Sequence, residues 1–391
     1  MKKLLSLILS LCLLCSLFLV SCGTDEQKKD QEDEKQEEKD PKTEIFDTVI
    51  AMLSEERYDV EGFLDDYFGE FYVPALSNGQ NKFIFKKGDV VASAQNNGET
   101  LYLKVKDGKL STVCRTDDGA KLHLESTVDY PYSYPLSIFT SFGIDMSGVY
   151  SIEENTVEEP ELDYADLELS EDGKTVVFGE EYMSKLAIYL FQSMDDAEKD
   201  LKDLEATGVY TVADEKIVFE ISANSETHGK LKAYCSYTEE NGVPSSSVAE
   251  ISMDKDGTVA SMKATLKDMK FENGKLSSFV EEFVKTAVAS GVSNGTAYTQ
   301  TSTQTSTYSF EKKDGKAANF DIEIITNAVL EYSGGKQTSD STVSFSVIDG
   351  NLNYTATANG QNAGSVSSSG VTFGDTSSLT IPEEVYNTFP K

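Results

Sequence analysis

The sequence predicts an α+β protein in which curved antiparallel β-sheets are each backed by one or two amphipathic helices. Long stretches alternate apolar and polar residues with a period of two, as strands do when one face meets a core and the other meets water. Dipeptides such as Asn97-Gly98, Asp107-Gly108 and Asp349-Gly350 separate these stretches, and they favour tight hairpin turns. Between the strand-like stretches, apolar residues recur at helical spacing.

The first residues have the layout of a secretory signal. Lys2 and Lys3 precede an apolar run from Leu4 to Val20 that is interrupted only by serines and cysteines. The run has about 17 residues, which is also near the length of a membrane-spanning helix, so an uncleaved membrane helix is the alternative.

The residues that follow favour cleavage and lipid attachment. Leu19-Val20-Ser21-Cys22-Gly23 resembles the bacterial lipobox. The resemblance implies cleavage after Ser21, so that residues 1–21 are a signal peptide, and attachment of lipid to Cys22. Acyl chains on one cysteine would hold the protein at the outer face of the cell membrane. The alternative is a signal peptide with an incidental cysteine.

The composition of the chain restricts the classes of molecule that it can bind. The net charge of −33 opposes binding to nucleic acid and to anionic headgroups, and it favours solubility and cationic partners. The chain has two arginines, Arg57 and Arg115, which excludes recognition of phosphate or carboxylate by a cluster of arginines.

The chain after the lipobox begins with a tether. Thr24 to Lys42 contains no apolar residue, so residues 22–42 are predicted to be a lipidated cysteine followed by a disordered acidic segment. The next segment, residues 43–147, is predicted to hold a helix over Thr43–Glu55, capped by Asp40 or Thr43, and then an antiparallel meander over Phe83–Val128.

An aromatic stretch with Pro131 and Pro135 interrupts this meander from Asp129 to Tyr150, and the prolines exclude a central strand. One interpretation is an irregular loop that packs its rings on the sheet, which is favoured because aromatic side chains commonly fill cores. The other is a lid over an apolar cavity, whose ligand-lining residues would be Tyr130, Tyr132, Tyr134, Phe139 and Phe142.

Residues 148–272 contain a repeated phrase. Gly148-Val149-Tyr150 and Gly208-Val209-Tyr210 each precede stretches with strand periodicity and hairpin dipeptides. This pattern resembles the lipocalin-like domains of bacterial lipoproteins, which implies a β segment over these residues. Apolar residues from Tyr182 to Leu204 predict a helix inserted between the repeats.

The last segment, residues 273–391, is predicted to repeat the plan of a helix followed by a meander. The helix is expected over Leu276–Ala289, strands follow to Ala358, and a strand marked by Pro382 closes the chain over Leu379–Val385. In its architecture this plan resembles the LolA-like and LppX-like lipid-carrier lipoproteins.

The residue types needed for catalysis or metal binding do not occur in a recognisable pattern. His123 and His228 lack zinc-type spacing, and Asp254-x-Asp256-Gly257 fits a hairpin turn better than a calcium loop. Cys114 and Cys235 are expected to be buried free thiols rather than a disulfide. No catalytic residue, metal site or cofactor is therefore predicted, and the chain is expected not to be an enzyme.

These observations predict a lipid-anchored protein outside the cytoplasm that binds a hydrophobic ligand in or on a curved sheet. The alternative is a structural or protein-interaction module of the cell envelope. The expected partners are the membrane through the lipid anchor, and either a hydrophobic ligand or an envelope protein; nucleic acid is excluded by charge.

Overall fold

The computed structural model of the chain describes residues 41–53, 63, 70–73, 83–86, 91–96, 99–106, 109–127, 160–191, 201–293, 296–373 and 381–390. The chain forms two compact units. The first contains residues 1–59 and 155–253, and the second contains residues 60–154 and 254–391. These two units do not coincide with the three consecutive segments, 43–147, 148–272 and 273–391, that the sequence suggests.

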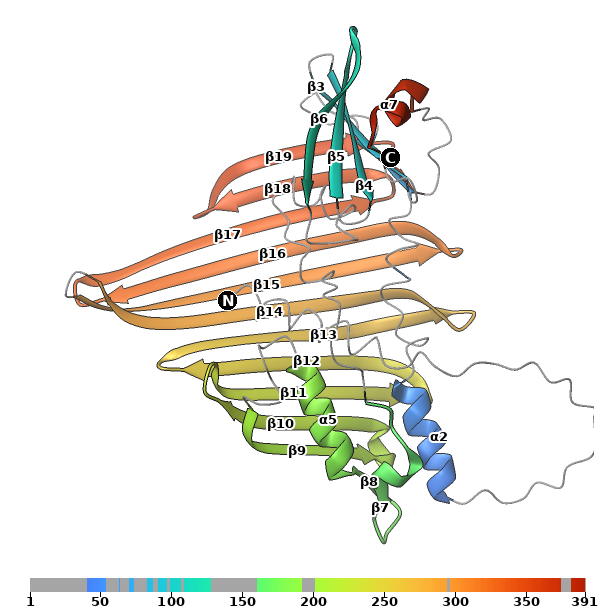
Figure 1. Cartoon of the computed structure of the whole chain (residues 1–391), viewed down its shortest axis with the longest axis vertical. Helices are drawn as coiled ribbons and strands as arrows, with labels where there is room; N and C mark the ends of the chain where they lie inside the picture. Colours follow the sequence, from blue (N-terminus) through green and yellow to red (C-terminus); the bar gives the residue numbers. More distant parts are fainter. Residues whose placement is uncertain are drawn as a thin grey trace, which may run out of the picture. The chain divides into compact units, whose positions relative to one another are not determined.

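The first unit contains an antiparallel meander of six strands in sequence order (Figure 1). Its helices are α2 (Pro41–Leu53) and α5 (Glu180–Leu190), with short 3-10 turns η2 (Tyr164–Asp166) and η3 (Val212–Asp214). Its strands are β7 (Leu167–Leu169), β8 (Thr175–Phe178), β9 (Leu201–Thr211), β10 (Lys216–Ser225), β11 (Gly229–Glu240) and β12 (Val243–Lys255).

The predicted helix near the start of the ectodomain is confirmed. Helix α2 begins at Pro41, where a proline is favoured because the first helical residues have no backbone partner for their N–H groups. The proposed cap Asp40 lies outside the described residues, and the alternative cap Thr43 is wrong because it lies inside the helix. Pro41 and Lys42, which the sequence assigns to the acidic tether, also belong to the helix. Phe46 of this helix packs edge-on against Tyr164, with ring centroids 5.4 Å apart.

Period-two burial gives the strands of the first unit two different faces. Along β10, Ile217, Phe219, Ile221 and Ala223 are buried and the residues between them are more exposed. Helix α5 places its apolar side, including Met183, in the same core.

A glycine permits the close approach of α5 to the sheet. A Cβ atom added at Gly208 would lie 2.7 Å from the Met183 sulfur and 2.9 Å from the Phe178 Cβ atom. The Gly-x-Tyr phrase in β9 therefore has a packing role at this position.

The helix that the sequence predicts from Tyr182 to Leu204 is too long. The helix ends at Leu190, and Leu201 and Leu204 lie in strand β9. The positions of Leu201 and Leu204 fit a helical stripe, but pairing of β9 with β10 places them in a strand.

We predict that Gly208→Ala destabilises the first unit by about 2 kcal/mol, because the added methyl group overpacks the contact between α5 and β9. Denaturant unfolding measures the change. Gly364→Ala is the matched control, since a Cβ atom there lies 4.0 Å from its nearest neighbour, Tyr354 Cε1. Equal stability losses in the two variants would contradict the packing role of Gly208.

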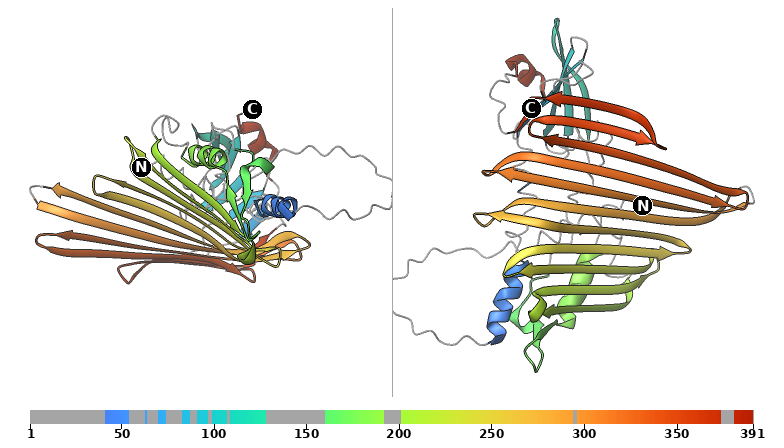
Figure 2. Two further views of the ribbon diagram at one scale, coloured as in Figure 1. Left: turned by 90° about the horizontal axis from the view of Figure 1, so that it is seen from below. Right: turned by 180° about the vertical axis from the view of Figure 1, so that it is seen from behind.

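The second unit contains a longer meander, also in sequence order, with strands that bend along their length (Figures 1 and 2). Its strands are β13 (Thr258–Glu272), β14 (Lys275–Ser293), β15 (Thr296–Lys313), β16 (Lys316–Tyr332), β17 (Gly335–Ile348), β18 (Asn351–Ala358) and β19 (Gln361–Ser369). The chain is thus mostly antiparallel β-structure with a large curved sheet and few helices.

Two smaller sheets complete the second unit. Strands β3 (Val91–Asn96), β4 (Glu99–Lys106), β5 (Lys109–Thr116) and β6 (Gly119–Thr127) form an antiparallel meander. The meander predicted over Phe83–Val128 is therefore confirmed except at its start, because Phe83 lies in a strand of a different sheet. Strands β2 (Phe83–Lys86), β1 (Glu70–Val73) and β20 (Thr372–Phe373) form the other sheet.

The hairpin turns are confirmed where the structure describes them. Asp256, Asp314 and Asp349 have φ values of 51°, 53° and 48°, and the glycine after each also has a positive φ. Two consecutive residues with positive φ match the right-handed twist of the paired strands, and Asp-Gly dipeptides tolerate this conformation. Asp256-Gly257 is therefore a hairpin turn, as predicted, rather than part of a calcium loop.

The helix predicted over Leu276–Ala289 is wrong, because these residues belong to strand β14. Apolar residues occur there at spacings that suit either structure, and pairing with β13 and β15 on both sides decides the outcome. Phe279 and Phe283 are buried on one face, whereas the β-branched Val280 and Val284 lie on the other and are partly exposed.

The strand predicted at the end of the chain is also wrong in the described residues. Pro382 directly precedes helix α7 (Glu383–Thr388), which it suits because its φ of −59° leads into a helix and it needs no N–H partner. Val385 and Phe389 pack with Tyr102 and Val113 of the four-stranded sheet.

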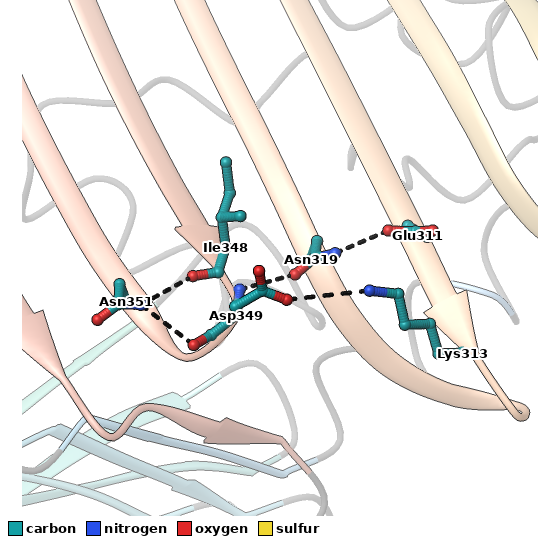
Figure 3. Close-up of polar contacts among 6 residues, drawn as sticks. All are labelled: Glu311, Lys313, Asn319, Ile348, Asp349 and Asn351. Atoms are coloured by element: carbon teal, nitrogen blue, oxygen red, sulfur yellow. Dashed lines mark hydrogen bonds and ion pairs between the residues drawn. The ribbon is translucent and has the colours of Figure 1, made fainter.

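A polar network joins the turns at one end of β15 to β18 (Figure 3). The Asn319 amide nitrogen donates to Glu311 Oε2 at 2.7 Å, and the Asn319 oxygen accepts from the Asp349 backbone N–H at 2.9 Å. The Asn351 amide nitrogen donates to the backbone oxygens of Asp349 and Ile348, at 3.2 and 3.4 Å. The start of β18 is thereby held to the neighbouring hairpin.

Candidate functional site

The site residues predicted from the sequence lie outside the described part of the chain. This applies to Ser21 and Cys22, and to the predicted ligand-lining aromatics Tyr130, Tyr132, Tyr134, Phe139 and Phe142. Of the helices that the structure describes, none combines the length and the apolar character needed to cross a membrane.

An open groove of about 620 Å³ lies on the first unit, over strands β9 to β12. The same period-two alternation that buries one face of these strands turns the other face to solvent. The side chains of this solvent face that line the groove are Glu205, Thr207, Glu220, Ser222, Lys232 and Tyr234. Strand β12 contributes Glu250 and Ser252.

Strand register places these side chains in two cross-strand rows. Thr207, Glu220 and Tyr234 stand opposite one another, and Glu205, Ser222 and Lys232 form the adjacent row. Residues in one row have Cβ atoms about 5 Å apart, and diagonal neighbours lie within about 8 Å. Side chains far apart in the sequence are therefore brought to one small area.

The groove has more negative than positive groups. The carboxylates of Glu205, Glu220 and Glu250 stand against the ammonium group of Lys232. Within the described part of the chain, none of these three carboxylates forms an ion pair, so they are available to a ligand. The described residues contain no group of His, Cys, Asp or Glu arranged to hold a metal ion.

The lining can therefore accept hydrogen bonds and attract positive charge, while its hydroxyl groups both donate and accept. Such a surface suits a polar ligand with amine or guanidinium groups better than an apolar one.

The second unit contains an unusual buried carboxyl group, that of Glu281. It lies on the core face of β14, between Phe279 and Phe283 on its own strand, and opposite Leu266 of β13 and Tyr308 of β15. The residue is 5% exposed, and within the described residues no hydrogen bond or ion pair reaches its side chain. Desolvation raises its pKa to about 8, because a buried carboxylate loses the water that stabilises its charge.

The face around Glu281 is closed. The side chains of Phe310, Phe320 and Phe345 are at most 1% exposed, and Phe63 packs edge-on against Phe279 at 5.1 Å. The aromatic face of β14 to β17 is therefore a packed core rather than an open apolar groove.

We predict that Glu281→Gln removes a pH dependence of stability. The folded chain holds the Glu281 proton more tightly than the unfolded chain, so the contribution is fully present below pH 4.5 and is lost as the pH rises to about 8. At about 1.4 kcal/mol per pKa unit the full loss is on the order of 5 kcal/mol. Urea unfolding at pH 5 and pH 8.5 measures it in both proteins.

Glu282→Gln is the control for this prediction. Glu282 lies on the opposite face of β14, where its side chain is 39% exposed and forms an ion pair with Lys267 at 3.3 Å. An exposed pair of this kind contributes less than about 1 kcal/mol. If Glu281→Gln keeps the wild-type difference between the two pH values, Glu281 does not hold its proton in the folded chain.

The remaining reactive side chains do not form a second site in the described residues. No disulfide joins Cys114 and Cys235. Cys235 is buried and Cys114 half-buried, so the expectation of burial holds fully for Cys235 alone. His123 is exposed, and the backbone N–H of His228 donates to Ser225 Oγ in a hairpin. Arg115 forms an exposed ion pair with Glu384.

Sequence reasoning missed both the groove and Glu281. In the sequence, the groove glutamates look like any other residues on the solvent face of a strand. Only the strand register shows that they lie close together. Glu281 carries a readable signal, since it occupies the buried phase of the pattern Phe279-x-Glu281-x-Phe283. That signal is visible only if the segment is treated as a strand.

Comparison of the chain with models of protein families, with curated proteins and with solved structures finds no match.

Proposed function

We propose that this chain is a lipid-anchored, non-enzymatic binding protein at the outer face of the cell membrane, and that its polar groove binds a positively charged partner of the cell envelope. This is the interaction-module alternative among the functions that the sequence predicts. The groove over β9 to β12, with three carboxylates and one ammonium group, carries the proposal.

The leader supports the anchoring part. Two positive residues, an apolar run and the lipobox-like residues around Cys22 are the features that export and lipid attachment require. The acidic tether from Thr24 to Asp40, ahead of helix α2, would separate the folded units from the membrane surface.

The distribution of polarity supports a hydrophilic partner. Among the described residues, the apolar face of the long strands is a packed core rather than an open apolar groove. The groove on the first unit, by contrast, is lined by carboxylates and hydroxyl groups. Binding of a hydrophobic ligand stays a prediction, because the aromatic residues that would line its site, from Tyr130 to Phe142, lie outside the described residues.

We predict that Cys22→Ala abolishes lipid attachment. In cells grown with an alkyne-labelled palmitate, the unsubstituted chain should carry the label and the variant should not, because the thiol of Cys22 is the acceptor. Cys235→Ala is the control, since this buried thiol is not available to an enzyme. Equal labelling of the Cys22→Ala and unsubstituted chains would exclude the lipobox assignment.

We predict that Glu220→Gln weakens binding of a tri-lysine peptide roughly five-fold, because one unpaired carboxylate at the centre of the groove contributes about 1 kcal/mol to binding a cation. Calorimetry at about 150 mM salt, where the Debye length is about 8 Å, limits the contribution of the distant negative charge.

Glu240→Gln supplies the matched control for the groove. Glu240 is an exposed glutamate at the end of β11 that does not line the groove, so the substitution makes the same change in net charge. Equal weakening by Glu220→Gln and Glu240→Gln would mean that the peptide follows net charge and not the groove.

A further inference from the structure

Strand β19 is the last strand of the meander in the second unit (Figures 1 and 2). One side of it pairs with β18, and among the described residues no strand pairs with its other side. Half of the backbone N–H and C=O groups of such an edge strand point away from the sheet, ready to pair with another strand. Several of its side chains, including that of Ser365, are exposed.

This edge lacks the charges that usually protect an edge strand. Gly350 to Phe373, which includes β18, β19 and β20, contains no Asp, Glu, Lys or Arg, although 26% of all residues in the chain are charged. It also contains no proline. One protective feature is present: the pairing of β18 with β19 shifts by one residue at Ala363. The regular part of the edge therefore runs from Gly364 to Ser369.

The edge strand of the first unit, β7, differs from β19 in length and charge. Strand β7 has three residues, its central Glu168 is exposed, and Asp166 and Asp172 lie close by in the sequence. A short edge strand with acidic residues resists pairing with another chain. The neutral edge at β19 is therefore a local property and does not follow from the composition of the whole chain.

Both ends of the β18–β19 hairpin are fixed to the sheet. At the turn, the Asn359 N–H donates to the Asp340 oxygen at 2.8 Å, and the Asp340 N–H donates to Asn359 Oδ1 at 3.1 Å. At the other end, the Val371 N–H donates to the Gly350 oxygen at 3.0 Å. The edge is thus held in an extended conformation before any partner arrives, which lowers the entropy cost of pairing.

We propose that β19 of one copy pairs with β19 of a second copy, antiparallel and about a two-fold axis, so that the sheets of two chains join at this edge. A two-fold interface brings the same segment together with itself, so the segment must be compatible with its own side chains. Gly364 to Ser369 consists of Gly, Ser and Val, and no register of antiparallel pairing brings like charges together.

The negative charge of the chain and the neutrality of the β19 edge favour a second copy of the chain as the partner that pairs with β19. Two chains of net charge −33 repel wherever their carboxylates approach closely, and a neutral edge is where the backbones can meet with the least repulsion. At physiological salt, charges beyond about 8 Å are largely screened. A cationic partner, by contrast, gains nothing from an edge that carries no carboxylate.

The first test places a cysteine on the edge of the full-length chain in membranes. Ser365→Cys should give a crosslinked dimer with a bis-maleimide of about 10 Å, because cross-strand neighbours lie within about 8 Å of one another. Ser302→Cys is the control, since Ser302 lies in β15 and is paired on both sides. Absence of a dimer with Ser365→Cys, an equal dimer with Ser302→Cys, or a product with a different protein overturns the proposal.

The second test places a charge on the edge. In sedimentation of the full-length chain in detergent, Ser365→Lys should raise the dimer dissociation constant at least about ten-fold, because it would place two like charges in the joined edge. Ser302→Lys adds the same charge to an interior strand and should leave the constant unchanged. A chain that stays monomeric at about 100 µM, or a dimer that Ser365→Lys does not weaken, overturns the proposal.

Discussion

One-sided burial of antiparallel strands is the constraint on which the rest of this protein depends. Strands of the two meanders pair with their neighbours through backbone hydrogen bonds, and their side chains alternate between a closed apolar face and a polar one. The apolar face accounts for the stability of both units. The polar face is turned to solvent, and the groove over β9 to β12 occupies part of it.

Three features of the two units depart from this pattern, either in packing or in charge. Gly208 lacks a side chain because α5 lies against the strand there. Glu281 places a carboxyl group among aromatic rings, where it is stable mainly in the protonated form. The edge at β19 lacks the charges found at β7. Each departure has a separate physical cause.

The proposed binding functions use different parts of the same scaffold. A lipid anchor and tether would hold the units near the membrane, the groove would attract positive charge, and the β19 edge would join two copies by backbone hydrogen bonds. The groove would act through side-chain charge and the edge through neutral backbone groups, so the two would recognise partners by different chemistry.

The sequence by itself determined the described hairpins and most of the strands, because these depend on local chemistry. An Asp-Gly pair such as Asp314-Gly315 favours a tight turn whatever surrounds it. Only the tertiary structure decided that Leu276–Ala289 is a strand, that the inserted helix stops at Leu190, and that a helix follows Pro382. It also decided which glutamates share a groove and that Glu281 is buried. Such outcomes depend on which strands become neighbours, and pairing between distant residues is not encoded in any short window of sequence.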